Sequence, residues 1–217
     1  MFQGCIFDLD GVIVDTAKYH FLAWRRLANT LGFDFDEAQN EKLKGVSRVE
    51  SLNLILQWGG VEKTGQEKQI LMDDKNAWYL EYIDEMTPKE ILPGVIDFLT
   101  DLKQKNIKIG LGSASKNAGR ILERIGLTGF FDTIVDGNQV TASKPDPEVF
   151  LKGAENMRLS PGDCIVFEDA EKGIEAAING GFRAVGVGKK EQLPAAHLVI
   201  GGFQNVTFDD IVKNLKK

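Results

Sequence analysis

The sequence has few cysteines, no long apolar run and no excess of positive charge. Its two cysteines, Cys5 and Cys164, lie in short apolar runs, which predicts small buried side chains and neither a disulfide framework nor a zinc site. No apolar stretch approaches the length of a membrane span, and no signal peptide precedes the first apolar run. We therefore expect a cytoplasmic protein of a reducing compartment that does not contact a membrane.

The charge balance is acidic, with a net charge of −6 at pH 7. Broad nucleic-acid binding requires a basic face, so the sequence disfavours this class of function. A small phosphorylated ligand stays compatible, because a few lysine and arginine side chains can set the sign of the field inside a cleft. No helix suited to assembly is evident, and we expect a monomer that binds a small sugar phosphate.

Short apolar runs alternate with segments of helical spacing along the 217 residues, which suits one core domain with a modest insert. Such alternation predicts an α/β fold, with a Rossmann-like parallel sheet and helices on both faces. The expected strands lie at residues 4–9, 107–111, 133–135, 164–167 and 184–187, and residues 198–200 are a candidate sixth strand.

One interval, residues 15–87, contains no convincing strand. Apolar residues recur there at helical spacing over residues 19–31, 51–58 and 70–83. The pattern predicts a small all-helical cap domain inserted after strand one. The cap would comprise residues 15–87, and the core residues 1–14 and 88–217.

The first expected strand ends in two carboxylates, Asp8 and Asp10, which are followed by Gly11. In an open α/β sheet, ligands bind beyond the carboxyl ends of the strands, so both carboxylates can face one site. Gly11 permits a sharp turn of the backbone at that point. The alternative is a solvated turn, in which aspartate and glycine are common.

The other strand ends favour a site over a turn. Ser113 opens a donor-rich segment at a helix start, Lys144 lies in a loop stiffened by prolines, and Glu168 and Asp169 follow a buried run. Donors at a helix start suit an anion, although Ser113 could be a helix cap and Lys144 a solvated charge. With Asp8, these residues predict Mg²⁺-dependent phosphoryl transfer, because Mg²⁺ prefers carboxylate and phosphate oxygens.

Four segments of the chain resemble, in order and spacing, the four motifs of the haloacid dehalogenase-like phosphotransferase superfamily. They are Asp8-Leu9-Asp10-Gly11, Ser113, Lys144-Pro145 and Glu168-Asp169. This resemblance spans almost the whole chain. It implies an aspartyl-phosphate on Asp8, Asp10 as general acid and base, and Ser113 and Lys144 as groups that hold phosphate charge. It also implies Mg²⁺ ligands among Asp8, Asp10, Glu168 and Asp169, with direct or water-mediated binding by Glu168 left open.

Within this superfamily, the chain resembles the bacterial β-phosphoglucomutase family. The resemblance is carried by residues 16–24, 42–51, 75–76 and 113–117. That resemblance implies interconversion of β-D-glucose 1-phosphate and D-glucose 6-phosphate through β-D-glucose 1,6-bisphosphate. It assigns catalytic roles to Thr16 and His20, with His20 controlling Asp10. It assigns substrate binding to Gly11, Trp24, Gly45, Val46, Ser47, Arg48, Ser51, Lys75, Ala114, Ser115, Lys116 and Asn117.

The resemblance places Arg48 at the distal phosphate, because a guanidinium group can contact phosphate at two points. Closure of the cap would exclude water and direct the phosphoryl group to a sugar hydroxyl. A second candidate function is a phosphatase for a sugar phosphate or similar metabolite. A binding protein without turnover is disfavoured, because every expected catalytic position is filled. At single positions, Arg48 and Lys75 could be solvated charges, His20 a packed histidine and Trp24 part of the cap core.

Overall fold

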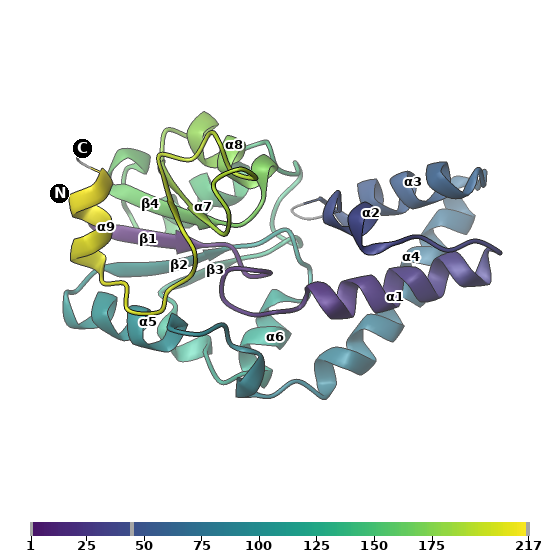
Figure 1. Cartoon of the computed structure of the whole chain (residues 1–217), viewed down its shortest axis with the longest axis horizontal. Coiled ribbons are helices and arrows are strands. Elements are labelled where there is room, and N and C mark those ends of the chain that lie inside the picture. Colours follow the sequence, from purple (N-terminus) through teal and green to yellow (C-terminus); the bar gives the residue numbers. More distant parts are fainter. Residues whose placement is uncertain (1, 44–45, 216–217) are drawn as a thin grey trace.

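The computed structural model describes residues 2–43 and 46–215. Its centre is a six-stranded sheet in the order β3-β2-β1-β4-β5-β6, and every neighbouring pair is parallel. The strands are β1 (Gly4–Phe7), β2 (Lys108–Gly112), β3 (Thr133–Val135), β4 (Cys164–Glu168), β5 (Arg183–Val187) and β6 (Leu198–Ile200). Figure 1 shows helices on both faces of this sheet, which confirms the predicted fold class.

The helices fill the intervals between the strands. They are α1 (Ala17–Thr30), α2 (Glu37–Glu41), α3 (Arg48–Gly59), α4 (Gly65–Asp84), α5 (Val95–Gln104), α6 (Ala118–Arg124), α7 (Glu148–Asn156), α8 (Glu171–Asn179) and α9 (Phe208–Leu215). Short 3₁₀ helices lie at Pro88–Glu90, Thr128–Phe130 and Pro161–Asp163. The sequence prediction contained no counterpart of α2, which has only five residues.

The central strand β1 divides the core into two apolar layers, because successive strand residues point to opposite faces. Cys5 and Phe7 belong to a buried cluster that includes residues of α5, α6 and α9. Ile6 belongs to a second buried cluster, formed with residues of α7 and α8. Both faces of β1 are therefore covered, which explains why its sequence is apolar throughout instead of alternating.

The helices α1, α3 and α4 pack against one another beside the sheet (Figure 1). A third buried cluster joins them, with Trp24 and Leu27 from α1, Ile55 from α3 and Met72 from α4. We refer to residues 15–87 as the cap and to the remainder as the core. This division and its boundaries stay a prediction.

Two backbone crossings connect the cap with the core, and they run side by side. The Asp15 N–H donates to the Glu90 carbonyl at 3.0 Å, and the Leu92 N–H donates to the Ile13 carbonyl at 3.0 Å. Away from these crossings, Arg120 of α6 donates to the Asp84 carboxylate at the end of α4, at 2.6 Å.

Both cysteines are buried and free, as the sequence predicted. Burial raises the pKa of the Cys164 thiol to about 12, which leaves it protonated and unreactive. In the described part of the chain, no helix is both long enough and apolar enough to cross a membrane.

Candidate active site

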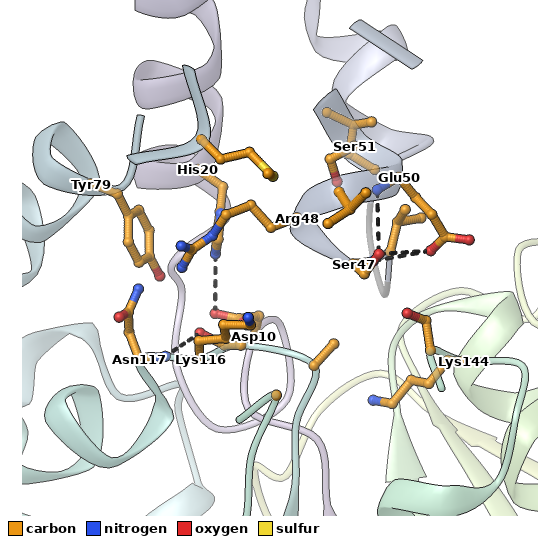
Figure 2. A pocket seen from close by; sticks show the side chains of 18 of the residues that line it. Asp10, His20, Ser47, Arg48, Glu50, Ser51, Tyr79, Lys116, Asn117 and Lys144 are labelled. Carbon is orange, nitrogen blue, oxygen red and sulfur yellow. Dashed lines mark hydrogen bonds and ion pairs between the residues drawn. The ribbon is translucent and has the colours of Figure 1, made fainter. Parts of the chain in front are cut away.

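A cleft of about 530 Å³ lies between the carboxyl ends of the strands and the cap helices. Its wall contains sixteen of the residues predicted from the sequence: Asp8, Asp10, Gly11, His20, Trp24, Val46, Ser47, Arg48, Ser51, Lys75, Ala114, Ser115, Lys116, Asn117, Lys144 and Asp169. Figure 2 shows the labelled cap side chains facing Asp10, Asn117 and Lys144 across this space. Residues distant in sequence are thus brought to one place.

Three further predicted residues lie behind the wall of the cleft. Thr16, Ser113 and Glu168 are completely buried, and each contacts residues of the wall or its neighbouring backbone. Gly45, which was predicted to bind substrate, lies outside the described residues. The roles assigned to all these residues stay predictions.

Lys144 connects the ends of three segments. Its Nζ lies 2.6 Å from Asp8 Oδ1, after β1, and 2.7 Å from Glu168 Oε1, at the end of β4. The other oxygen of Glu168 accepts a hydrogen bond from the Ala170 N–H at 2.7 Å. Glu168 therefore has protein donors on both carboxylate oxygens, and it fixes the position of the Lys144 ammonium group.

The electrostatics of this cluster are dominated by burial. Burial raises the pKa of Asp8 to about 7, and the neighbouring Glu168 and Asp10 carboxylates add to this rise against the opposing effect of Lys144. Burial by itself lowers the pKa of Lys144, but Asp8 and Glu168 outweigh that effect, so the net shift is upward. Lys144 is consequently a permanent cation among several carboxylates.

Asp10 is held by two residues at the start of α1. The Thr16 hydroxyl donates to Asp10 Oδ1, and His20 Nε2 lies 3.9 Å from the same oxygen (Figure 2). Burial raises the pKa of Asp10, although the Thr16 hydrogen bond opposes the shift. Burial and the nearby Lys75 and Arg48 charges lower the pKa of His20, so its ring is neutral.

Gly11 lets the loop after β4 approach the two aspartates. It has a φ of +79°, which L-residues rarely adopt, and a Cβ at this position would lie only 2.2 Å from Asp169 Oδ2. The Asp169 carboxylate therefore lies directly against the Asp8–Asp10 turn. Among the described residues no three histidine, cysteine, aspartate or glutamate side chains form a preassembled metal cage.

The cap side of the cleft carries two basic side chains, Lys75 and Arg48, and burial lowers the pKa of both. Lys75 Nζ lies 3.0 Å from His20 Nδ1, and it sits over the rings of Trp24 at 4.6 Å and Tyr79 at 4.4 Å. Arg48, at the first position of α3, donates through Nη2 to Asn76 Oδ1 at 2.8 Å. In the part of the chain that the structure describes, no carboxylate lies within ion-pair distance of Arg48.

The segment after β2 is organised by its own hydroxyl groups. The Ser115 N–H donates to Ser113 Oγ at 3.1 Å, and the Asn117 N–H donates to Ser115 Oγ at 3.3 Å. This leaves the Asn117 side chain directed toward the cap, where its Nδ2 donates to Asn76 Oδ1 at 3.0 Å. Ser113 thus shapes the turn but does not cap α6, because the N-cap of that helix is Asn117 and no described side chain caps it.

The sequence assigned no site role to two residues near the cleft, although Asn76 belonged to the Lys75-Asn76 pair that carries the resemblance. Tyr79 of α4 is completely buried beside the His20 ring, with centroids 4.2 Å apart, and its hydroxyl has no hydrogen-bond partner among the described residues. Asn76 accepts from both Arg48 and Asn117. The helical spacing of residues does not predict these contacts, because the contacting residues come from other segments of the chain.

A family model described as haloacid dehalogenase-like hydrolase matches residues 5–187. The chain belongs to the haloacid dehalogenase-like hydrolase family. This confirms the superfamily inferred from the four acidic, hydroxyl and lysine motifs.

Several members of this family are similar over nearly their full length. A β-phosphoglucomutase of Bacillus subtilis is 48% identical over 95% of this chain and 92% of its own. A crystal structure of a β-phosphoglucomutase from Clostridium difficile has a TM-score of 0.95 and 44% identity, and covers 100% of this chain and 98% of that one. A phosphorylated carbohydrates phosphatase of Thermotoga maritima is 32% identical over 99% of both chains.

Proposed function

We propose that the chain is a Mg²⁺-dependent β-phosphoglucomutase. It interconverts β-D-glucose 1-phosphate and D-glucose 6-phosphate through β-D-glucose 1,6-bisphosphate, with an aspartyl-phosphate on Asp8. Two near-full-length relatives with this name, at 48% and 44% identity, support the proposal. The substrate is a small phosphorylated sugar, which fits a cleft of about 530 Å³.

One observation carries the proposal: a cation lies at the end of the cleft opposite the two aspartates. Asp8 and Asp10 form the core end, and the Arg48 guanidinium lies at the cap end, where a neutral amide and no described carboxylate holds it. A bisphosphate presents two anionic groups and must bind with either one at Asp8. A cation without an acidic partner at the opposite end suits the phosphate that is not reacting.

The chemistry then runs in two steps on the chain's own residues. An Asp8 oxygen attacks phosphorus, the bond from phosphorus to the sugar oxygen breaks, and Asp10 gives its proton to the departing sugar oxygen. In the second step Asp10 takes the proton of a sugar hydroxyl, whose oxygen attacks the phosphoryl group and releases the Asp8 carboxylate. The pKa of Asp10, which burial raises, suits a group that must carry a proton, and the Thr16 hydrogen bond favours the ionised form that takes the proton back.

The residues at the core end fit Mg²⁺. The Asp169 carboxylate lies against the Asp8–Asp10 turn at Gly11, which brings hard oxygen donors near one another, although the described side chains form no preassembled cage. We expect the Asp8 and Asp169 carboxylates and the backbone carbonyl of Asp10 to hold the ion, which leaves the Asp10 carboxyl group able to carry a proton, and we expect Glu168 to act through Lys144. When bound, Mg²⁺ neutralises phosphate charge.

The alternative function is hydrolysis of a phosphorylated sugar, and the 32% identical Thermotoga maritima phosphatase favours it. The two functions differ only in the acceptor of the second step. Wild-type protein is given β-glucose 1-phosphate, Mg²⁺ and a trace of β-glucose 1,6-bisphosphate, and glucose 6-phosphate and free phosphate are both measured. A mutase yields mainly glucose 6-phosphate, and mainly free phosphate would refute the proposal.

The same assay tests the nucleophile. Asp8→Asn should abolish formation of the phosphoryl-enzyme, which can be detected by mass after acid quenching. Normal turnover in this variant would refute the assignment of Asp8.

A further inference from the structure

Asn76, on the inner face of α4, receives hydrogen bonds from two different parts of the molecule. Its Oδ1 accepts from Arg48 Nη2 of the cap at 2.8 Å and from Asn117 Nδ2 of the core at 3.0 Å. Both lone pairs of this oxygen are therefore used. One amide oxygen joins two donors that the sequence assigned to substrate binding.

The chemistry of this acceptor matters because of the charge on Arg48. Burial lowers the pKa of the Arg48 guanidinium against the opposing effect of the Asp73 charge, so this cation is poorly solvated and gains from a hydrogen-bond acceptor. A carboxylate in place of Asn76 would neutralise the guanidinium. The neutral amide satisfies one N–H group and leaves the positive charge available to an incoming anion.

Asn76 also fixes the direction of the two donors. A free arginine side chain samples many rotamers, and a ligand that binds it must restrict that freedom. In the structure Arg48 and Asn117 converge on one point, the Oδ1 atom of Asn76. The oxygen of Asn76 stands at that point, as a phosphate oxygen could.

We propose that Asn76 is a positioning residue that assembles Arg48 and Asn117 into a preformed clamp for the distal phosphate of a sugar bisphosphate. This inference rests on the proposed function, because it takes the second phosphate as the ligand. Asn76 acts through Arg48 and Asn117. A neutral amide at this position is the feature on which the clamp depends.

Two substitutions separate charge from shape. Asn76→Ala removes the acceptor and leaves Arg48 free. Asn76→Asp keeps the size and shape, but it pairs Arg48 with a carboxylate and places a negative charge beside the incoming anion. Asn53 supplies the matched control, because its Oδ1 accepts from a cation, Lys68 Nζ, at 2.8 Å on the exposed surface of the cap. It lies outside the wall of the cleft.

Binding of β-glucose 1,6-bisphosphate is measured by calorimetry with Mg²⁺ present, in an Asp8→Asn background that does not transfer the phosphoryl group. We expect Asn76→Ala to weaken binding about 3–10-fold, the loss of roughly one hydrogen bond. Asn76→Asp should weaken it about 30-fold or more, because an ion pair must break first. Asn53→Ala and Asn53→Asp should stay within about twofold of the parent.

Kinetics in protein that retains Asp8 give an independent measurement. In both Asn76 variants, the bisphosphate concentration for half-maximal turnover should rise by a larger factor than the factor by which kcat falls. Wild-type affinity in Asn76→Asp, or a loss confined to kcat, would overturn the clamp. If wild-type protein forms no glucose 6-phosphate, the proposed function fails, whereas the calorimetric comparison still decides the role of Asn76.

Discussion

Lys144 Nζ lies 2.6 Å from Asp8 Oδ1, although 136 residues separate the two in the sequence. The same nitrogen serves Glu168 at 2.7 Å, so one buried cation is shared by two buried carboxylates. With Asp10 close by, negative charge exceeds positive charge at this end of the cleft. That excess suits a phosphoryl-transfer site that recruits a divalent cation, and it has consequences for stability.

The first prediction concerns Asp8 and the stability of metal-free protein. Its folded-state pKa is raised from 3.8 to about 7, so the folded state binds the Asp8 proton more tightly than the unfolded state does. The stability that this group contributes is fully present below pH 3.8 and is lost as the pH rises toward 7. Without Mg²⁺, we expect Asp8→Asn to raise the free energy of unfolding at pH 8 by about 2–4 kcal/mol.

Urea denaturation in a chelator, at pH values from about 4 to 8, measures this difference. The two proteins should converge near the acid end of that range. Asp74→Asn, at an exposed position of the same chain, serves as the control and should show no such trend. A stability difference independent of pH would contradict the electrostatic explanation.

The second prediction concerns Arg48 as the contact for the distal phosphate. Arg48→Ala removes about two charge-assisted hydrogen bonds and should lower mutase turnover roughly 100-fold or more at low substrate. Hydrolysis of a small monophosphate such as acetyl phosphate should fall less than about fivefold. Arg26→Ala, at an exposed arginine of α1, is the control. Equal losses in the two assays would show that Arg48 does not bind the distal phosphate.

The third prediction uses the close approach of Gly11 to Asp169. Gly11→Ala places a methyl group 2.2 Å from the present position of Asp169 Oδ2, so the carboxylate must move. We expect the Mg²⁺ concentration for half-maximal activity to rise about tenfold, together with a stability loss of about 1–2 kcal/mol from the positive φ.

Gly32→Ala separates these two effects. Gly32 has a φ of +88°, and apart from its chain neighbours no described residue has an atom within 4 Å of the position that its Cβ would take. It should show a similar loss of stability with an unchanged Mg²⁺ requirement. An equal change in the Mg²⁺ requirement of both variants would contradict the assignment of Asp169.

The fourth prediction concerns the Tyr79 hydroxyl, which has no hydrogen-bond partner among the described residues. A buried polar group without a partner costs about 1–3 kcal/mol, so Tyr79→Phe should raise the free energy of unfolding of the ligand-free protein by about 1 kcal/mol. Tyr19→Phe, which removes a hydroxyl that donates to Glu90 at 3.3 Å, should leave stability unchanged or slightly lower. Thermal denaturation measures both, and a clear loss of stability in Tyr79→Phe would contradict the prediction.

Much of the fold was predictable, because the strands are short apolar runs separated by helical patterns. The gathering of Asp8, Lys144 and Asp169 also followed from the sequence, since the carboxyl ends of parallel strands meet at one edge of the sheet. The helix α2 was missed because five residues show no periodicity. Its capping box of Asp36 and Gln39 was the available signal.

The contacts that join separate segments were not predictable from spacing. The hydrogen bonds of Asn76 with Arg48 and Asn117 depend on how the cap lies over the core. Residue spacing within one segment does not give this arrangement. The same holds for Glu168, which resembled a metal ligand beside Asp169. Its two oxygens accept from Lys144 and from the Ala170 N–H, and this arrangement became visible only in three dimensions.

The two crossings between cap and core have a mechanical consequence. Because Asp15 bonds to Glu90 and Leu92 bonds to Ile13, the crossings form one narrow ribbon. Movement of the cap away from the core at this point would break both bonds, so the ribbon restricts how the cap can move. Thr16 belongs to the cap and Asp10 to the core, and a hydrogen bond joins them. A change in the orientation of the cap would therefore stretch or break this bond, so the surroundings of the acid–base group depend on where the cap lies.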